Sequence, residues 1–139
     1  MFLALEPALV ARLRERLTER VHVLTAADLA DVAEGSQPTP AVHVVYQGYS
    51  ADPGPMLTLT QTWLTVIAVR QVASVRSGSG ARADAGVIAD SVLAALHRYR
   101  APGYRPLQLT TAPRPGYRGG HLYLPLAWTT AYTETLPCE

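Results

Sequence analysis

The chain has 139 residues, of which 48% are hydrophobic and 17% charged, and its formal net charge is +1. This composition excludes a wholly disordered chain, because such chains combine low hydrophobicity with high net charge. The single cysteine, Cys138, excludes an intrachain disulfide and a cysteine-based zinc site. No run of apolar residues has the roughly 18 residues that a membrane span needs. The first residues lack the basic start of a secretory signal. We expect one domain over residues 1–139, with no membrane contact.

The first half of the chain predicts a surface helix followed by strands. A helix is expected over 7–20, because Leu5, Leu9, Leu13 and Leu17 recur every fourth residue and form one apolar stripe. The segments expected next are a strand over 21–24, a short helical turn over 26–33, a strand over 41–46 and a loop over 48–55.

A long strand over 58–73 follows, and its middle is apolar on both faces, which is typical of a central strand. The second half predicts a helix over 82–100, a short strand over 107–111, a loop over 113–120 and a last strand over 121–133. Pro125 has no backbone N–H, so the last strand is expected at a sheet edge or bulged there. Trp63 and Trp128 lie at apolar strand positions and are expected in the core.

These elements predict an α+β fold with a four- to five-stranded, mainly antiparallel sheet and two helices packed on one face. Two of the expected strands run for about 13 residues, or roughly 43 Å. A globule of this chain length is only about 37 Å across. The sheet is therefore expected to project as an arm, and an arm with apolar faces and open edges needs a partner. A second copy of the chain is the simplest one.

The last third of the chain is basic. Residues 91–133 contain five arginines and no acidic residue, with tyrosines between the arginines. The stretch 98–118 suits a phosphate backbone, an acidic protein surface, or simply a solvated loop in which arginines lie along the surface.

Catalytic and metal-binding patterns are missing from the sequence. His22 and His43 both occur in Val-His-Val contexts, on strands that are able to pair. Two ligands do not make a metal site, so we expect both histidines to face solvent. The Ser77–Gly80 segment lacks the spacing of a phosphate-binding loop, and the chain has no lysine. We predict a structural or binding protein that is not an enzyme and uses no cofactor or metal.

Three segments resemble a known family: TQTWLTVIAVRQVA (60–73), ARADAGVIADSVLAAL (81–96) and APRPGYRGGHLYLPLAWTTAY (112–132). Together with the opening amphipathic helix, they are similar to the tail terminator proteins of long-tailed bacteriophages, in particular the Mu-like minor tail family. The resemblance covers nearly the whole chain. It transfers no catalytic residues.

The resemblance implies an α+β subunit that forms a ring, usually a homohexamer, at the head-proximal end of the virion tail. Such a ring caps the tail tube, stops its polymerisation and joins the tail to the head connector. The implied partners are further copies of the chain, the tail tube protein, the connector or neck protein, and the sheath protein if the tail contracts. Genomic DNA passes through the lumen without specific binding. Assembly takes place in the host cytoplasm.

Two alternatives stay open: another head–tail joining or tail-completion protein, and a small non-catalytic binding module. Contacts between subunits are expected in three segments, 47–58, 74–81 and 113–120. Arginine and tyrosine are enriched at protein interfaces. The candidate interface residues are Tyr46, Tyr49, Arg76, Arg114, Tyr117 and Arg118.

Overall fold

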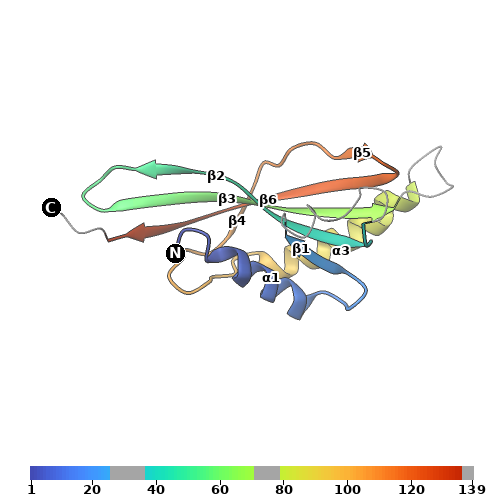
Figure 1. Cartoon of the computed structure of the whole chain (residues 1–139), viewed down its shortest axis with the longest axis horizontal. Coiled ribbons are helices and arrows are strands. Elements are labelled where there is room, and N and C mark those ends of the chain that lie inside the picture. The colour runs from blue at the N-terminus through green and yellow to red at the C-terminus, as the bar shows by residue number, and fades with distance from the viewer. Residues whose placement is uncertain (26–36, 71–78, 136–139) are drawn as a thin grey trace.

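The computed structural model describes residues 1–25, 37–70 and 79–135. Its helices are α1 (Leu5–Arg16) and α3 (Ser79–Leu96), and its strands are β1 (His22–Thr25), β2 (Ala41–Asp52), β3 (Leu57–Arg70), β4 (Gln108–Thr110), β5 (Gly116–Arg118) and β6 (His121–Glu134). Figure 1 shows that α1 and α3 cover the same face of the sheet. No described helix is long and apolar enough to cross a membrane.

The strands form one sheet in the order β1-β2-β3-β6-β4, with β5 paired to β6 as well. The pair β1–β2 is parallel and the other pairs are antiparallel. The predicted α+β class, mainly antiparallel sheet and helices on one face are confirmed, but the sheet has six strands and not four to five. The additional strand is β5, which lies in the Gly/Pro-rich segment 113–120 that was expected to be a loop.

The strand β2 is twice as long as predicted, because the segment 48–55 is mostly strand and not loop. Pairing between β2 and β3 continues to Asp52, opposite Thr58, after a register shift between Tyr46 and Gly48. Gly48 has φ +150°, a conformation that residues with a side chain rarely adopt. The glycine that suggested a break in the strand therefore permits a bulge within it.

The core lies between the helices and the sheet. Leu5, Leu9 and Leu13 of α1 are at most 1% exposed, as the predicted apolar stripe requires. Trp63 and Trp128 face each other across the β3–β6 ladder and are fully buried, so their assignment to the core is confirmed. The Trp128 indole Nε1 donates to Thr65 Oγ1 at 3.0 Å, which satisfies its polar atom inside the core.

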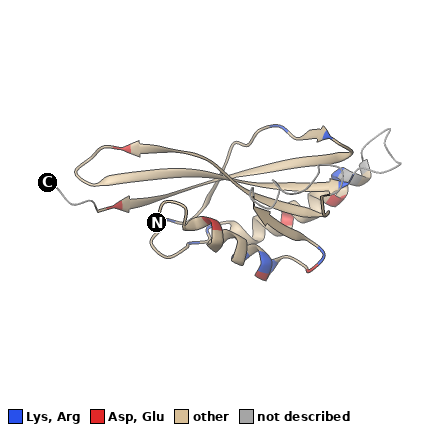
Figure 2. Ribbon diagram, in the orientation of Figure 1, with Lys and Arg blue, Asp and Glu red and all other residues tan. Residues whose placement is uncertain are grey.

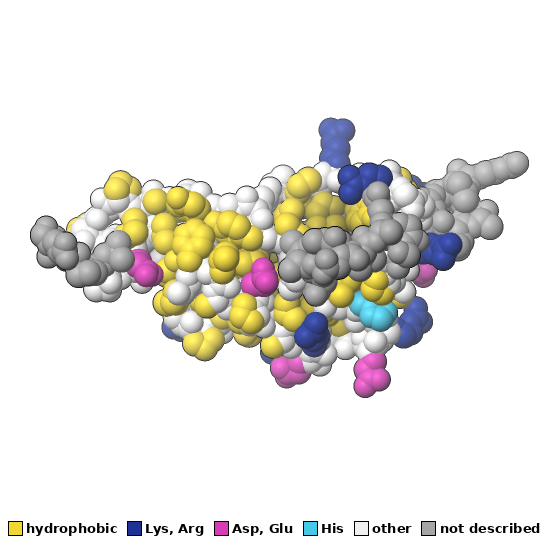
Figure 3. Space-filling view, viewed as in Figure 1, with side chains coloured by type: hydrophobic (Ala, Val, Ile, Leu, Met, Phe, Trp, Pro, Cys, Tyr) yellow, Lys and Arg dark blue, Asp and Glu magenta, His cyan; other side chains and the backbone are white. Residues whose placement is uncertain are grey.

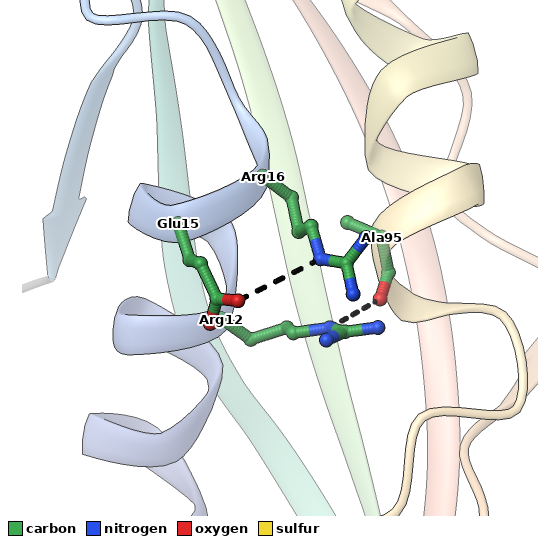
Figure 4. A network of polar contacts seen from close by, with 4 residues as sticks. All are labelled: Arg12, Glu15, Arg16 and Ala95. Carbon is green, nitrogen blue, oxygen red and sulfur yellow. Dashed lines mark hydrogen bonds and ion pairs between the residues drawn. The ribbon is translucent and has the colours of Figure 1, made fainter.

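An arginine joins the two helices. Figure 4 shows Arg12 of α1 reaching across to the last turn of α3, where its Nε donates to the Ala95 carbonyl at 2.9 Å. The last carbonyls of a helix have no partner within it, and a cation is favourable there. The Arg12 guanidinium also lies 4.9 Å from the Tyr99 ring centre. The neighbouring Glu15–Arg16 ion pair, at 4.0 Å, is exposed and contributes little.

The helix expected over 82–100 ends earlier, at Leu96. Arg98 has φ +61°, in the left-handed region that ends helices. Its N–H donates to the Leu107 carbonyl, and the Leu107 N–H donates to the Tyr99 carbonyl. The chain therefore leaves α3 and pairs with itself before it enters β4.

Pro125 lies in an inner strand of the sheet, and neither in an edge strand nor at a bulge in the β3–β6 pairing, as was expected. β6 is flanked by β3 on one side and by the short strands β4 and β5 on the other. The partners of β5 end at Tyr123 and those of β4 begin at Ala127, so this side of β6 has no registered partner at Pro125. The missing N–H is tolerated because that side of the strand is locally an edge.

Candidate functional site

The three longest strands continue past the helices and form an arm, defined here as residues 47–62 and 129–135. Figure 1 shows the β2–β3 hairpin and the end of β6 projecting to one side of α1 and α3. The strands themselves are 12, 14 and 14 residues long. This geometry matches the predicted projecting sheet.

An aromatic cluster lies where the arm begins, on the face of the sheet that the helices cover further along. The Phe2 ring lies edge-on to Tyr46 and Tyr49, with centres 5.9 and 5.4 Å apart, and Tyr46 lies 5.1 Å from Trp63. The Gln61 Nε2 donates to the Phe2 carbonyl at 2.6 Å. Figure 3 shows hydrophobic side chains gathered over this end of the molecule.

The two tyrosines predicted as contacts differ in exposure. Tyr49 is 59% exposed, so its ring is accessible at the surface. The Tyr46 hydroxyl is buried and has no hydrogen-bond partner among the residues that the structure describes. Burial, and then the nearby Tyr49, raise the pKa of Tyr46. Tyr46 is therefore a packing residue, and Tyr49 is the surface residue of this pair.

The other predicted contacts lie on and beside β5. Arg114, Tyr117 and Arg118 are all exposed, Tyr117 by 52%. The Arg118 guanidinium lies 5.8 Å from the ring centre of Tyr123, its neighbour on β6. Arg76 and most of the segment 74–81 lie outside the described residues.

The structure does not bring these two groups together. Tyr49 of β2 pairs with Gln61 of β3, which in turn pairs with Thr130 of β6. Tyr117 of β5 pairs with Leu122 of β6. Eight residues of extended strand correspond to roughly 26 Å. Figure 2 shows acidic residues on the arm and arginines near β5. The predicted site thus becomes two separate surfaces with different charge.

The basic stretch 98–118 is also divided. The Arg100 Nε donates to the Tyr104 carbonyl at 3.1 Å, and the Arg105 N–H donates to Ala131 of β6, so this part lies against the inner face of the arm. Arg114 and Arg118 belong to the β5 region at the other end of β6. A nucleic acid would not meet these arginines as one continuous patch.

A groove that sequence analysis did not find lies at the end of the sheet away from the arm. It has a volume of about 570 Å³ and lies between the end of α1, the start of α3 and the end of β3. Val69 and Ile88 contribute apolar surface, and Arg20, Arg70 and Asp84 contribute charge. Val87, on its helix wall, is 68% exposed.

The two strand histidines are not neighbours. In the parallel β1–β2 ladder, His43 is aligned with Leu24, and His22 with Ala41. His43 is 2% exposed, with its Nε2 at 3.2 Å from the Gln37 Oε1, so the expectation that it faces solvent is wrong. His22 is exposed. The described residues contain no group of three or more histidine, cysteine or carboxylate side chains placed to hold a metal.

Comparison with known families identifies the chain. A family model described as phage tail terminator protein matches residues 1–136. No curated protein sequence matches the chain. The match spans every described element, including the arm, the groove and β5. The chain therefore belongs to the phage tail terminator family, a family of structural proteins of the bacteriophage tail.

Proposed function

We propose that this protein forms a homohexameric ring at the head-proximal end of the tail, where it caps the tail tube and ends its polymerisation. The observation that carries the proposal is the arm, which extends beyond the helices and leaves Tyr49 and Met56 more than half exposed. Membership in the tail terminator family supports the same role.

A ring needs a particular kind of contact. Each subunit must use two different surfaces, because a head-to-tail interface that closes gives a ring. The arm and the opposite end of the sheet, with the groove and β5, supply two such surfaces. Such a ring stops growth when one axial face fits the last tube subunits and the other does not.

The proposed partners follow from this position. One axial face of the ring binds the tail tube protein, and the other binds the connector or neck protein that joins the tail to the head. A sheath protein is a further partner if the tail contracts. Residues 1–139 act as one domain of the Mu-like minor tail type, without catalysis or cofactor, and genomic DNA passes through the ring without specific binding.

Mass photometry of the purified protein, alone and with tail tubes, tests the proposal. We expect a species of about 90 kDa, six copies of the 15.0 kDa chain. Tail tubes assembled with the protein should stop at a uniform length, and those without it should continue to grow. A chain that stays monomeric even with tubes, and leaves their length unchanged, would contradict the proposal.

Electron microscopy of intact particles separates this role from that of another head–tail joining or tail-completion protein. A terminator ring contacts the last ring of the tail tube directly. Density for this chain that has no contact with the tube would favour the other joining role.

A further inference from the structure

The groove at the end of the sheet away from the arm has a partly apolar lining. Its apolar lining includes Leu17, Val21, Pro40 and Val69, and the exposed Val87 and the partly buried Ile88 of α3 form one wall. A volume of about 570 Å³ is within the range of sites that hold a ligand or several side chains.

Among the residues that the structure describes, the lining of the groove has a positive balance of charge. Arg20 and Arg70 flank it, against the one carboxylate of Asp84 in that described lining. Both arginines are exposed, and neither forms an ion pair within the part of the chain that the structure describes. A segment that combines apolar side chains with carboxylates would therefore complement this groove.

The tip of the arm has that composition. The turn between β2 and β3 consists of Pro53, Gly54, Pro55 and Met56, and Met56 is 53% exposed. The arm carries Asp52 and Glu134 and contains no lysine or arginine. Two prolines restrict the turn before any contact forms, which lowers the entropy that docking must overcome.

The arm of a molecule is unable to reach its own groove. Leu57 begins β3 beside the arm tip, and Arg70 ends the same strand beside the groove. The 14 residues between these ends span roughly 43 Å of paired strand in the middle of the sheet. Any contact between arm and groove must therefore join two molecules, and it joins unlike surfaces.

We infer that the groove holds the β2–β3 arm tip of a neighbouring copy, with Met56 against the Val87–Ile88 wall and the Asp52 carboxylate toward Arg20 and Arg70. This inference rests on the proposed ring and names its subunit contact. Each copy gives an arm to one neighbour and receives an arm from the other, which is the repeating contact that a ring requires. The tube protein is the competing occupant of the groove, and the test below distinguishes it.

Disulfide trapping tests the contact. In a Cys138→Ser background, Met56→Cys and Val87→Cys place one thiol on the arm tip and one on the groove wall, both at exposed positions. A disulfide forms only if the two Cα atoms come within about 7 Å. We expect oxidation with copper phenanthroline to give a ladder of covalent oligomers up to the full ring on a denaturing gel, without added tube protein.

Matched controls use the same chemistry at other exposed positions. Each single cysteine variant has one thiol and should stay monomeric on the gel, because the contact joins unlike surfaces. Met56→Cys with Tyr117→Cys, which is 52% exposed on β5, should give no ladder. A disulfide-linked dimer from Met56→Cys alone, or a ladder from the Tyr117 pair in place of the Val87 pair, would overturn the inference.

Charge exchange gives an independent measurement. Asp52→Arg and Arg70→Asp should each raise the concentration for half-assembly at least about tenfold, and the double variant should recover most of that loss. If rings form but neither the ladder nor the recovery appears, the inference fails and the proposed function stands. If the double cysteine variant gives no ladder and added tail tubes protect Val87→Cys from a maleimide label, the occupant is the tube protein. If the wild-type chain forms no ring under any condition, both fail.

Discussion

The same three strands cross two regions that differ in what covers them. In the helix-covered half, Val42, Ile67 and Leu122 are buried beneath α1 and α3. In the arm, the outer face is lined by threonines, with Thr58 and Thr133 hydrogen-bonded at 3.3 Å. The inner face of the arm is covered by Phe2 and by the connection from α3 to β4. One half of the sheet is thus covered by helices, and the other has exposed side chains such as Tyr49 and Met56.

This difference predicts that substitutions in the two regions act on different properties. Burial against helices supplies most of the stability, because buried apolar area is the main favourable contribution to folding. The arm has a buried inner face, with Leu59 and Tyr132 in the core, but its outer face and its tip are covered by nothing in the described structure, so changes at these exposed positions should alter assembly more than folding. The predictions below test this division.

The largest expected effect is in the helix-covered half. Leu13→Ala removes a fully buried side chain from the α1 stripe and should lower the free energy of unfolding by about 2–5 kcal/mol. Thr60→Ala, at an exposed position on the outer face of the arm, should stay within about 0.5 kcal/mol. Urea unfolding followed by circular dichroism measures both. Equal losses would mean that the arm is as much a part of the core as α1.

Periodicity predicted the helix-covered half because burial there imposes a pattern. The leucines of α1 recur every fourth residue, and β3 is apolar on both faces because it lies inside the sheet. The β2 part of the arm, residues 47–52, has no such pattern. Gly48 and the Pro53–Pro55 turn are local signals of a loop, and the pairing that makes 48–52 a strand comes from β3.

The next effect concerns the N-terminal cover of the arm. Phe2→Ala removes the ring contacts to Tyr46 and Tyr49 and should cost about 1–2 kcal/mol. Hydrogen exchange should rise in the arm amides and stay unchanged in α1 and α3. Leu3→Ala is the control, because Leu3 is 54% exposed. Unchanged exchange in the arm would show that strand pairing alone holds it.

The candidate surfaces were predictable only in part. Exposed Tyr49, Tyr117 and Arg118 follow from the preference of interfaces for aromatic and arginine residues. The burial of Tyr46 was not predictable, because Phe2 covers it from a segment 44 positions away. The groove was also not predictable, because its walls come from α1, β3 and α3, which are far apart in the sequence.

Two tyrosine hydroxyls allow a smaller and sharper comparison. The Tyr104 hydroxyl donates to the Met1 carbonyl, so Tyr104→Phe should cost about 1 kcal/mol. Tyr46→Phe should cost nothing or stabilise slightly, because it removes a buried hydroxyl with no hydrogen-bond partner in the described structure. Thermal unfolding of the two variants measures the difference. A loss on Tyr46→Phe as large as that on Tyr104→Phe would reveal a partner for the Tyr46 hydroxyl.

The smallest effect is a dependence on alkaline pH that originates in the arm. Burial first, and then the Glu134 carboxylate, raise the pKa of Tyr132 above its ordinary value of 10.0. The folded state therefore keeps the phenol proton at pH values where the unfolded chain has released it. The resulting stability is fully present below the unfolded pKa and is lost as the pH rises through the folded pKa.

Tyr132→Phe should make the fall in melting temperature between about pH 9 and 11 shallower. Tyr117→Phe, at an exposed tyrosine, should leave that slope unchanged. If both variants have the wild-type slope, the ionisation of Tyr132 is not linked to unfolding. Tyr132 lies where the arm meets the α3–β4 connection, and its ring centre is 5.2 Å from that of Tyr104. A shallower slope for Tyr132→Phe would therefore show that this junction opens in the global unfolding step.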